Sequence, residues 1–427
     1  MRTLVVLAFV AACGNSPDPR VIKGGGVGDG AIDGVVNVYV IDNDTYEPIV
    51  DATVDIAGKQ ATTDDTGLVI VQDVSGPQTV AVKAAGYRGA VWQDANGANL
   101  TIPVTKLGNL TAQQATLSGT VAGWDTVTVP SGHAKAALVG YSQTDDLGDP
   151  ANNLQTPASG NLCIGNPSTC TFSVVTRTGH VTLTAAIVDV DPKGNADPSD
   201  DVITIVGWAT APAVQVDAGV NQTGIALTQL EAGQLQNVTI DYGTPPDALT
   251  KHDALVGIEL SKDEVIQLPV LPSGATKALV PTPAAFLPSA TYRLTAIAQT
   301  TTTDATGGPQ SVILQRGQTG TTLGADQWLT TPTNVTASRT TASLAKVANA
   351  KLHSVQWSDA NGILLEVTLF DPAKLTADVP DLLALPSSGV LTAKAQGIGA
   401  DIDISSFSLD TDIDLLWGIS VQPETIE

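Results

Sequence analysis

Short runs in which apolar and polar residues alternate recur along the chain, and they constrain its fold more than any other feature. VVNVYVID (35–42), DATVDIAG (51–58) and DIDISSFSLDTDIDLLWGIS (401–420) have the period of two that is typical of β-strands. The runs are rich in Val and Thr, and 40 Gly and 25 Pro supply turns between them. A helical period is nearly confined to two short segments, near 252–262 and 372–384. The sequence therefore predicts an all-β protein.

At 427 residues the chain is too long for one ordinary domain. Its strands fall into four groups that are separated by turn-rich or Pro-rich segments, and each group predicts a β-sandwich. The predicted parts are a signal peptide (1–12), a flexible tether (13–34), and β-sandwiches at 35–108, 115–231, 236–327 and 328–427. We therefore expect four tandem β-sandwich domains.

The first predicted sandwich has motifs of a known family. They are the strand PIVDATV with Ala52, the turn Asp65-Thr66-Gly67, and the strand end Ala85-Gly86-Tyr87. The pattern resembles the carboxypeptidase regulatory-like family, which belongs to the transthyretin-like and Cna-B-like sandwiches. The resemblance implies a seven-strand sandwich and supplies no catalytic residue. From the residues themselves we expect a positive φ at Gly67, and a Tyr87 ring that covers the end of the sandwich.

The other predicted sandwiches have weaker family features. TLSGTVAGW (116–124) restarts a similar strand pattern, so 115–231 resembles a larger, diverged transthyretin-like sandwich. The region 236–327 has strands with Pro-rich connections. The last region contains a hairpin signal with its turn at residues 359–362, and it is loosely similar to immunoglobulin- and fibronectin-III-like modules. This last similarity is an analogy of fold only.

The N-terminus has one positive charge and then the apolar run LVVLAFVAA, which ends at Cys13. About ten apolar residues are too few for a membrane-spanning helix, which needs about 20. Such a run is typical of a secretory signal peptide. The segment Val10-Ala11-Ala12-Cys13 resembles the lipobox of bacterial lipoproteins. The resemblance implies cleavage before Cys13, a lipid anchor on its sulfur and, because Gly14 is not Asp, an outer-membrane lipoprotein facing the periplasm or the cell surface. The alternative is an ordinary signal peptide with an incidental cysteine.

Cys163 and Cys170 enclose six residues of a turn-rich loop. In an exported protein two nearby cysteines usually form a disulfide. The alternative is a redox pair, but that function favours a Cys-x-x-Cys motif beside the start of a helix. Because Cys13 is assigned to the lipid anchor, Cys163 and Cys170 remain as a matched pair. We therefore predict a disulfide between them.

An acidic run around a glycine, DVDPKGNADPSDD (189–201), is the strongest candidate for a metal site. Its oxygen-bearing side chains would suit the six to eight contacts that Ca²⁺ prefers. The predicted calcium ligands are Asp189, Asp191, Asn195, Asp197 and Asp201. The run is not an EF-hand, since Lys193 occupies its fifth position and flanking helices are missing. The alternative is a solvated Asp/Pro hairpin loop.

The net charge of −23 and the lack of Lys/Arg clusters argue against nucleic acid as a partner. HExxH, GxSxG, Walker and dinucleotide-binding motifs do not occur, and the four histidines are far apart in sequence. We therefore predict a non-enzymatic protein with no required cofactor, calcium aside. It would be held to the membrane by its lipid anchor, and its β-sandwiches would bind or adhere to an envelope protein or polysaccharide. The alternative is an accessory or catalytic subunit of an envelope hydrolase.

Overall fold

The structure is a computed structural model. The structure describes residues 26–28, 30–43, 45–107, 114–144, 162–165, 168–195, 201–261, 264–268, 274–300, 308–406 and 415–427. The predicted signal peptide, Cys13 and Asp197 lie outside these ranges. Within them the chain is built from strands and five short 3₁₀ turns. These are η2 (Trp124–Thr126), η5 (Ala232–Gln234), η6 (Pro283–Ala285), η7 (Asp381–Leu383) and η8 (Ile404–Ser406). The all-β fold class is confirmed.

No helix in the described part of the chain has the length and apolar character needed to cross a membrane. The predicted helical segment near 252–262 is wrong, because these residues form strand β17 (Lys251–Ser261). Its alternate residues Ala254, Val256 and Ile258 are buried in one core, which is the period of a strand. The segment near 372–384 is also not a helix beyond the single turn η7, and it contains β27 (Thr376–Asp378).

The first sandwich packs one small sheet on part of a much larger one. The small sheet has the order β1 (Gly26–Gly28), β8 (Asn99–Val104), β2 (Asp33–Asp42) and β5 (Leu68–Ser75). Opposite it lie β4 (Lys59–Thr62), β3 (Thr53–Ile56), β6 (Gln78–Lys83) and β7 (Gly89–Ala95). Strand β1 and the start of β2 fall in the segment that we predicted to be a tether. The folded part therefore begins before residue 35.

The predicted turn residues of the first sandwich behave as their chemistry suggests. Gly67 has a φ of +72°, and a Cβ atom there would lie 2.7 Å from the carbonyl oxygen of Val40. Only glycine combines this conformation with such a close approach. Gly86 also has a positive φ of +83°. The Tyr87 ring packs against the first core, and its hydroxyl donates a hydrogen bond of 2.8 Å to buried Asp42.

The second and third sandwiches each pair two sheets. In the second, β9 (Gln114–Val121), β12 (Cys170–Arg177) and β15 (Gln222–Gln229) face β10 (Ala134–Thr144), β11 (Leu162–Gly165), β13 (Gly179–Asp191) and β14 (Val202–Val216). In the third, β16 (Leu235–Asp241), β19 (Lys277–Pro281) and β22 (Thr322–Gly324) face β17, β18 (Glu264–Gln267), β20 (Thr291–Gln299) and β21 (Gln310–Gln318). Each pair of sheets encloses its own apolar core.

The fourth sandwich continues the large sheet of the first. Its small sheet contains β23 (Thr336–Ala337), β24 (Thr341–Ser343) and β27, and its large sheet contains β25 (Leu352–Asp359), β26 (Gly362–Leu369), β28 (Leu391–Ala400) and β29 (Leu416–Ile426). The predicted hairpin at 359–362 joins β25 to β26. Strand β26 then pairs in parallel with β7, from Gly89 opposite Leu365 to Gln93 opposite Leu369.

The first and fourth sandwiches therefore share one sheet that is covered on both faces. Val80, Val82 and Trp92 lie in the first core, whereas the alternate residues Ala81 and Val91 lie in the fourth. Strands that are buried on both faces have continuous rather than alternating apolar residues, and the VAV segment of β6 has this pattern.

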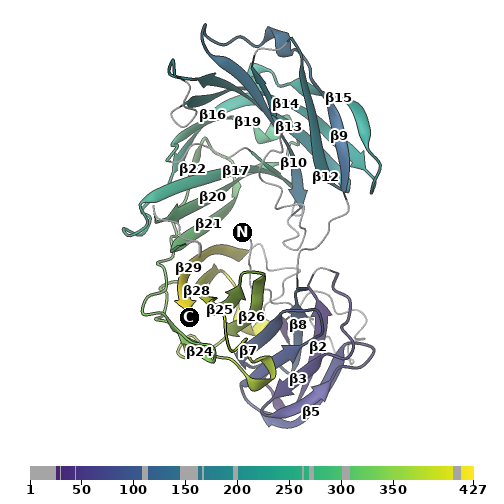
Figure 1. Cartoon of the computed structure of the whole chain (residues 1–427), viewed down its shortest axis with the longest axis vertical. Helices are drawn as coiled ribbons and strands as arrows, with labels where there is room; N and C mark the ends of the chain where they lie inside the picture. Colours follow the sequence, from purple (N-terminus) through teal and green to yellow (C-terminus); the bar gives the residue numbers. More distant parts are fainter. Residues whose placement is uncertain are drawn as a thin grey trace.

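The domains follow one another in space in a different order from the sequence (Figure 1). Strand β29 of the fourth sandwich pairs with β21 of the third, and the end of β10 in the second pairs with β18 of the third. The spatial order is therefore first, fourth, third, second. The sandwiches are tandem in the sequence, but strand pairings at sheet edges, and not chain connectivity alone, decide which of them are neighbours in space.

Candidate functional site

Charged side chains converge at one end of the second sandwich, beyond its apolar core. Lys135 on β10 lies opposite Asp189 on β13, and cross-strand neighbours share one face of a sheet. Two residues further into the strands, Ala137 and Ile187 are already in the core. At this end of the β10–β13 pair, the inward-facing side chains thus change from apolar to charged over two residues.

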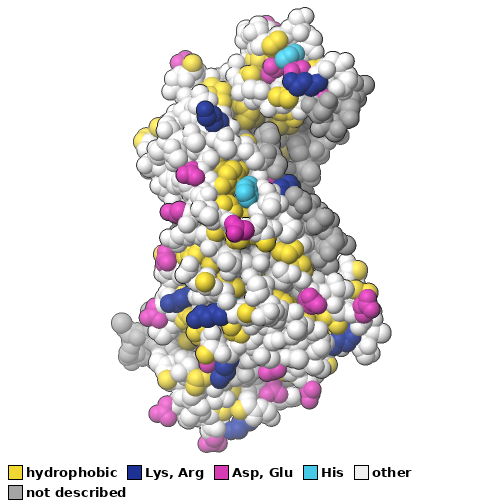
Figure 2. Space-filling model, turned by 90° about the vertical axis from the view of Figure 1, so that its left-hand side faces the viewer, with side chains coloured by type: hydrophobic (Ala, Val, Ile, Leu, Met, Phe, Trp, Pro, Cys, Tyr) yellow, Lys and Arg dark blue, Asp and Glu magenta, His cyan; other side chains and the backbone are white. Residues whose placement is uncertain are grey.

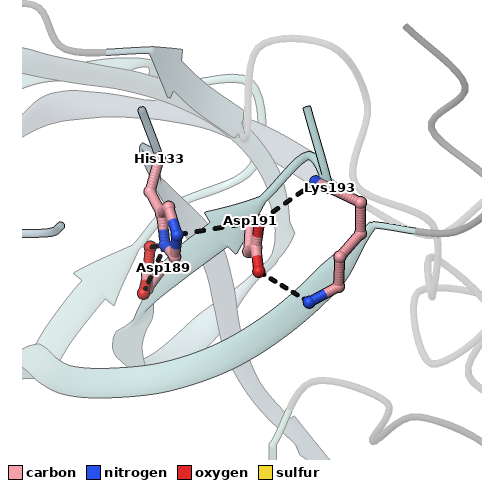
Figure 3. A network of polar contacts seen from close by, with 4 residues as sticks. All are labelled: His133, Asp189, Asp191 and Lys193. Carbon is pink, nitrogen blue, oxygen red and sulfur yellow. Dashed lines mark hydrogen bonds and ion pairs between the residues drawn. The ribbon is translucent and has the colours of Figure 1, made fainter. Parts of the chain in front are cut away.

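His133 lies between two carboxylates at this end (Figure 3). Its Nδ1 is 2.9 Å from Oδ1 and 3.1 Å from Oδ2 of Asp189, and its Nε2 is 3.6 Å from Oδ1 of Asp191. The side chains of His133 and Asp189 are 23% and 15% exposed, so the network is partly shielded from water. The imidazole therefore separates the two carboxylates and can pair with either.

Lys193 closes the same network from the loop that follows β13. Its ammonium donates to Oδ2 of Asp191 over 2.6 Å, and its backbone N–H donates to Oδ1 over 3.0 Å. The hydrogen bond from the Lys193 side chain, together with the backbone bond, holds the pKa of Asp191 below its ordinary value. Lys193 has a φ of +51° and Gly194 follows with +72°, which folds the loop back on the strand end.

Lys135 supports this end from within the sandwich. Its ammonium donates to the carbonyl oxygens of Trp124 and Val127 over 2.7 and 3.0 Å, and it lies 4.8 Å from the centre of the Trp124 ring. The side chain is buried, so its charge is compensated by carbonyl dipoles and by the ring. Lys135 therefore anchors the capping turn η2 rather than the exposed network.

The predicted calcium ligands meet only in part. Asp189 and Asp191 are brought together, Asn195 lies in the loop, Asp201 directly precedes β14, and Asp197 lies outside the described residues. Asp189 and Asp191 contact opposite nitrogens of the His133 ring, and the described ranges contain no group of three or more His, Cys, Asp or Glu placed to hold a metal ion. Calcium binding stays a prediction.

Sequence reasoning missed His133 as a member of this network. It is 56 residues from Asp189, and no motif spacing joins them. The pairing of β10 with β13 brings them together. The sequence did show that His133 directly precedes one alternating strand and that another strand ends in acidic residues. Pairing of these two strands would bring the histidine to the carboxylates.

The predicted disulfide is confirmed. Cys163 on β11 is bonded to Cys170 on β12, with their Cα atoms 5.6 Å apart. Because β11 and β12 belong to the two opposite sheets, the disulfide joins the faces of the second sandwich. Both side chains are buried in its core. The bond is a structural link and takes no part in the charged network.

Two buried titratable groups lie in the fourth sandwich, far along the chain from this site. The Nε2 of His353 accepts a hydrogen bond of 3.1 Å from the backbone N–H of Val347, and its Nδ1 is buried without a hydrogen-bond partner among the described residues. Burial, with a smaller effect of the Lys346 charge, lowers the pKa of His353 to about 4. Burial raises the pKa of Glu366 to about 7, against smaller opposing effects of Gln356 and Arg88. The fold therefore favours the neutral form of both groups.

No protein-family model and no curated protein match the chain. Among solved structures, the chain is similar to the TIE protein of Bacillus anthracis, with 14% identity, coverage of 62% of this chain and 45% of that one, and a TM-score of 0.15. This chain thus spans less than half of that protein.

Two further solved structures are similar to a comparable degree. One contains two B repeat units of the collagen-binding protein Cna of Staphylococcus aureus, with 10% identity, coverage of 79% of this chain and 99% of that one, and a TM-score of 0.13. The other is a putative carbohydrate binding protein from Bacteroides uniformis, with 11% identity, coverage of 43% and 98%, and a TM-score of 0.15. At these scores the similarities carry no argument about function, and the β-sandwich fold rests on the strand pairings described above.

Proposed function

We propose that this chain is a non-enzymatic, lipid-anchored protein of the cell envelope, whose β-sandwiches form a scaffold for binding or adhesion to a protein or glycan. One observation carries the proposal. Three strand pairings between domains, β7–β26, β29–β21 and β18–β10, join the four sandwiches edge to edge. Such pairings restrain the relative motion of domains, because every backbone hydrogen bond in the ladder must break before they separate.

This arrangement suits a scaffold that presents a surface at a distance from its anchor. The first sandwich follows the proposed anchor at Cys13, and the second sandwich forms the opposite end of the molecule (Figure 1). Two or three acyl chains would hold such a protein firmly, at about 0.8 kcal/mol per buried methylene. Net charge of −23 suits a soluble body that does not adhere to anionic lipid or nucleic acid.

The anchor is tested by expressing the full chain with Cys13→Ser beside the unchanged chain. We expect the unchanged chain in the membrane fraction, with an N-terminal peptide that begins at residue 13 and carries the mass of acyl chains. The serine variant should leave that fraction. A membrane-free unchanged chain, or an N-terminus elsewhere, would contradict the lipid anchor, and protease treatment of whole cells would distinguish periplasmic from surface exposure.

The binding function is tested with the delipidated chain against envelope extract and a glycan array. Capture of a defined protein or glycan supports the scaffold. Release of soluble fragments from envelope polysaccharide or protein during the same incubation would instead support the hydrolase alternative.

A further inference from the structure

Two edge strands elsewhere in this molecule have backbone groups that are hydrogen-bonded by side chains. Lys59 donates to the carbonyl oxygens of Gln72 and Asp73 on the edge strand β5, over 2.7 and 3.2 Å. Gln93 does the same for β27, since its Nε2 donates to the oxygen of Thr376 over 2.7 Å and its Oε1 accepts from the N–H of Asp378 over 3.1 Å. Covering unpaired backbone groups in this way prevents a further strand from adding to the sheet.

The first half of β14 is not closed in this way. It pairs with β13 from Val202 opposite Asp191, whereas its pairing with β15 begins only at Ala209. Among the described residues no strand pairs with the outer side of residues 202–207. The run VITIV (202–206) consists entirely of β-branched residues, and Val202, Ile203 and Val206 are 45%, 49% and 40% exposed. This segment is therefore an exposed strand of high β-propensity, and its outer edge has no strand partner among the described residues.

The two faces of this edge differ in chemistry. Val202 and Thr204 lie opposite Asp191 and Asp189, so one face continues into the charged network. There the carboxylates of Asp189 and Asp191 lie with the His133 ring and the one exposed ammonium of Lys193. Figure 2 shows histidine, acidic and basic side chains gathered beside hydrophobic ones at this end of the molecule.

The other face of the edge is apolar. Ile203 lies opposite Val190, and its neighbour Ile205 packs against the core of the third sandwich together with Trp208. An apolar side chain placed beside Ile203 would extend an interface that already exists. The edge thus combines free backbone groups, an acidic face and an apolar face.

We propose that the β14 edge is a docking site for an extended segment of a partner protein in which basic residues alternate with β-branched ones. The segment would add a strand beside Val202–Val206 and hydrogen-bond to its backbone. Its basic side chains would cross the small side chains of Val202 and Thr204 towards the carboxylates of the β13 strand, about 10 Å away at two strand spacings. Its alternate apolar side chains would pack on Ile203. This inference deepens the proposed binding role and rests on it.

A second copy of the chain fits this edge less well. An antiparallel β14 from another copy would set its own Asp189 and Asp191 on the same face, and each chain carries a net charge of −23. Like charges on one face of a strand pair are destabilising. Charge complementarity therefore favours a basic segment over self-association.

The test measures binding of a fluorescent ten-residue peptide that alternates Lys with Val and Thr to the full chain in detergent. Two other peptides, one with Glu in place of Lys and one with a central Pro, probe the charge and the strand conformation. Ile203→Lys places a charge on the edge, and Val175→Lys is the matched control because Val175 on β12 is 41% exposed. Both positions are exposed, so thermal unfolding should change little in either variant.

We expect the Lys peptide to bind more tightly at low than at high salt, and the Glu and Pro peptides to bind at least about tenfold more weakly. The variant Ile203→Lys should weaken binding of the Lys peptide by a similar factor. The variant Asp191→Asn should make that binding less dependent on salt. Equal binding of the Lys and Glu peptides would overturn the proposal. An equal loss of Lys-peptide affinity in Ile203→Lys and in Val175→Lys would overturn it too. So would a chain dimer that Ile203→Lys abolishes. Failure of every peptide, with capture of a glycan or another protein intact, would overturn the edge site and leave the proposed scaffold standing.

Discussion

The sheet shared by the first and fourth sandwiches and the junction between the second and third join domains by different means. In the shared sheet, β7 and β26 pair over five residues, and β7 supplies Trp92 to the first core and Val91 to the fourth. At the other junction, β10 and β18 pair over only three residues. The first connection is a common core layer, so we expect its two domains to unfold together. The second combines a shorter ladder with the contact of Ala186 and Trp208 with the third core, and we expect it to open separately from the shared sheet.

Polar groups carry much of the junction between the second and third sandwiches. Buried Ser142 donates to Oε1 of Glu264 over 2.6 Å and accepts from the N–H of Thr182 over 2.8 Å. Arg177 donates through Nε to the oxygen of Ser142 over 3.1 Å. Trp208 adds an apolar contact with the third core, and its indole N–H donates to the oxygen of Leu279 over 2.9 Å. A junction of this kind depends on geometry more than on buried area.

The largest expected effect comes from truncating matched tryptophans, Trp357 in the fourth sandwich and Trp208 at the junction. Both are fully buried, so either change to Ala should cost about 3–5 kcal/mol locally. Trp357→Ala should destabilise the first and fourth sandwiches together, whereas Trp208→Ala should loosen the second and third and leave the shared sheet protected. Hydrogen exchange followed by peptide mass spectrometry measures this. If β2 kept full protection when β25 lost it in Trp357→Ala, the two domains would not share a folding unit.

The next effect is a change in the free energy of unfolding with pH, caused by groups of the fourth sandwich. The native state keeps His353 neutral down to about pH 4, whereas the unfolded chain takes up the proton near pH 6.5. The unfolded chain therefore binds more protons in this window, and the free energy of unfolding falls by about 3 kcal/mol as the pH drops from 6.5 to 4. Denaturant titrations across this range should show the loss in the unchanged chain.

The variant His353→Gln should remove the loss of unfolding free energy at acid pH. The variant Glu366→Gln should instead change the pH dependence on the alkaline side. Since the native pKa of Glu366 is raised from 4.5 to about 7, its contribution is complete below pH 4.5 and is lost as the pH rises through 7. Glu366→Gln should therefore flatten the alkaline side only. A loss at acid pH that persists unchanged in His353→Gln would show that another group causes it.

A smaller effect is expected from Ser142→Ala at the polar junction. The change leaves the N–H of Thr182 and one oxygen of Glu264 with fewer partners, at a cost of roughly 1–3 kcal/mol. Hydrogen exchange should speed up in β18 and at the end of β10, with β7 and β26 unaffected. The control is Ser118→Ala, whose half-buried hydroxyl makes only a long contact of 3.4 Å and which should change little.

The smallest effect is expected from calcium, which we propose for the acidic loop after β13. Isothermal titration with Ca²⁺ should release heat, and millimolar calcium should raise the melting temperature of the second sandwich but not that of the shared sheet. Asp189→Asn should weaken this response. A titration without heat and without thermal stabilisation would leave the loop as a solvated hairpin with its carboxylates paired to His133 and Lys193.

The sequence predicted individual strands and turns better than their assembly. The alternation of VVNVYVID, the positive φ of Gly67 and the turn after Asp359 follow from local chemistry, and each is present. The disulfide followed from spacing and compartment. Local patterns could not reveal the spatial order of the domains, because that order depends on pairings such as β7 with β26 between distant residues. The candidate site was half predicted for the same reason, since only strand pairing brings His133 to Asp189.

The shared sheet also determines when the first sandwich can complete its folding. Gln93 hydrogen-bonds to Thr376, which lies 283 residues later in the chain. When the chain emerges N-terminus first, β7 has an unpaired edge, and Ala81 and Val91 have no core to enter, until nearly all of the protein has appeared. An incomplete first sandwich with an unpaired strand edge and exposed apolar side chains is prone to aggregate. The first domain to be made is thus among the last to be completed.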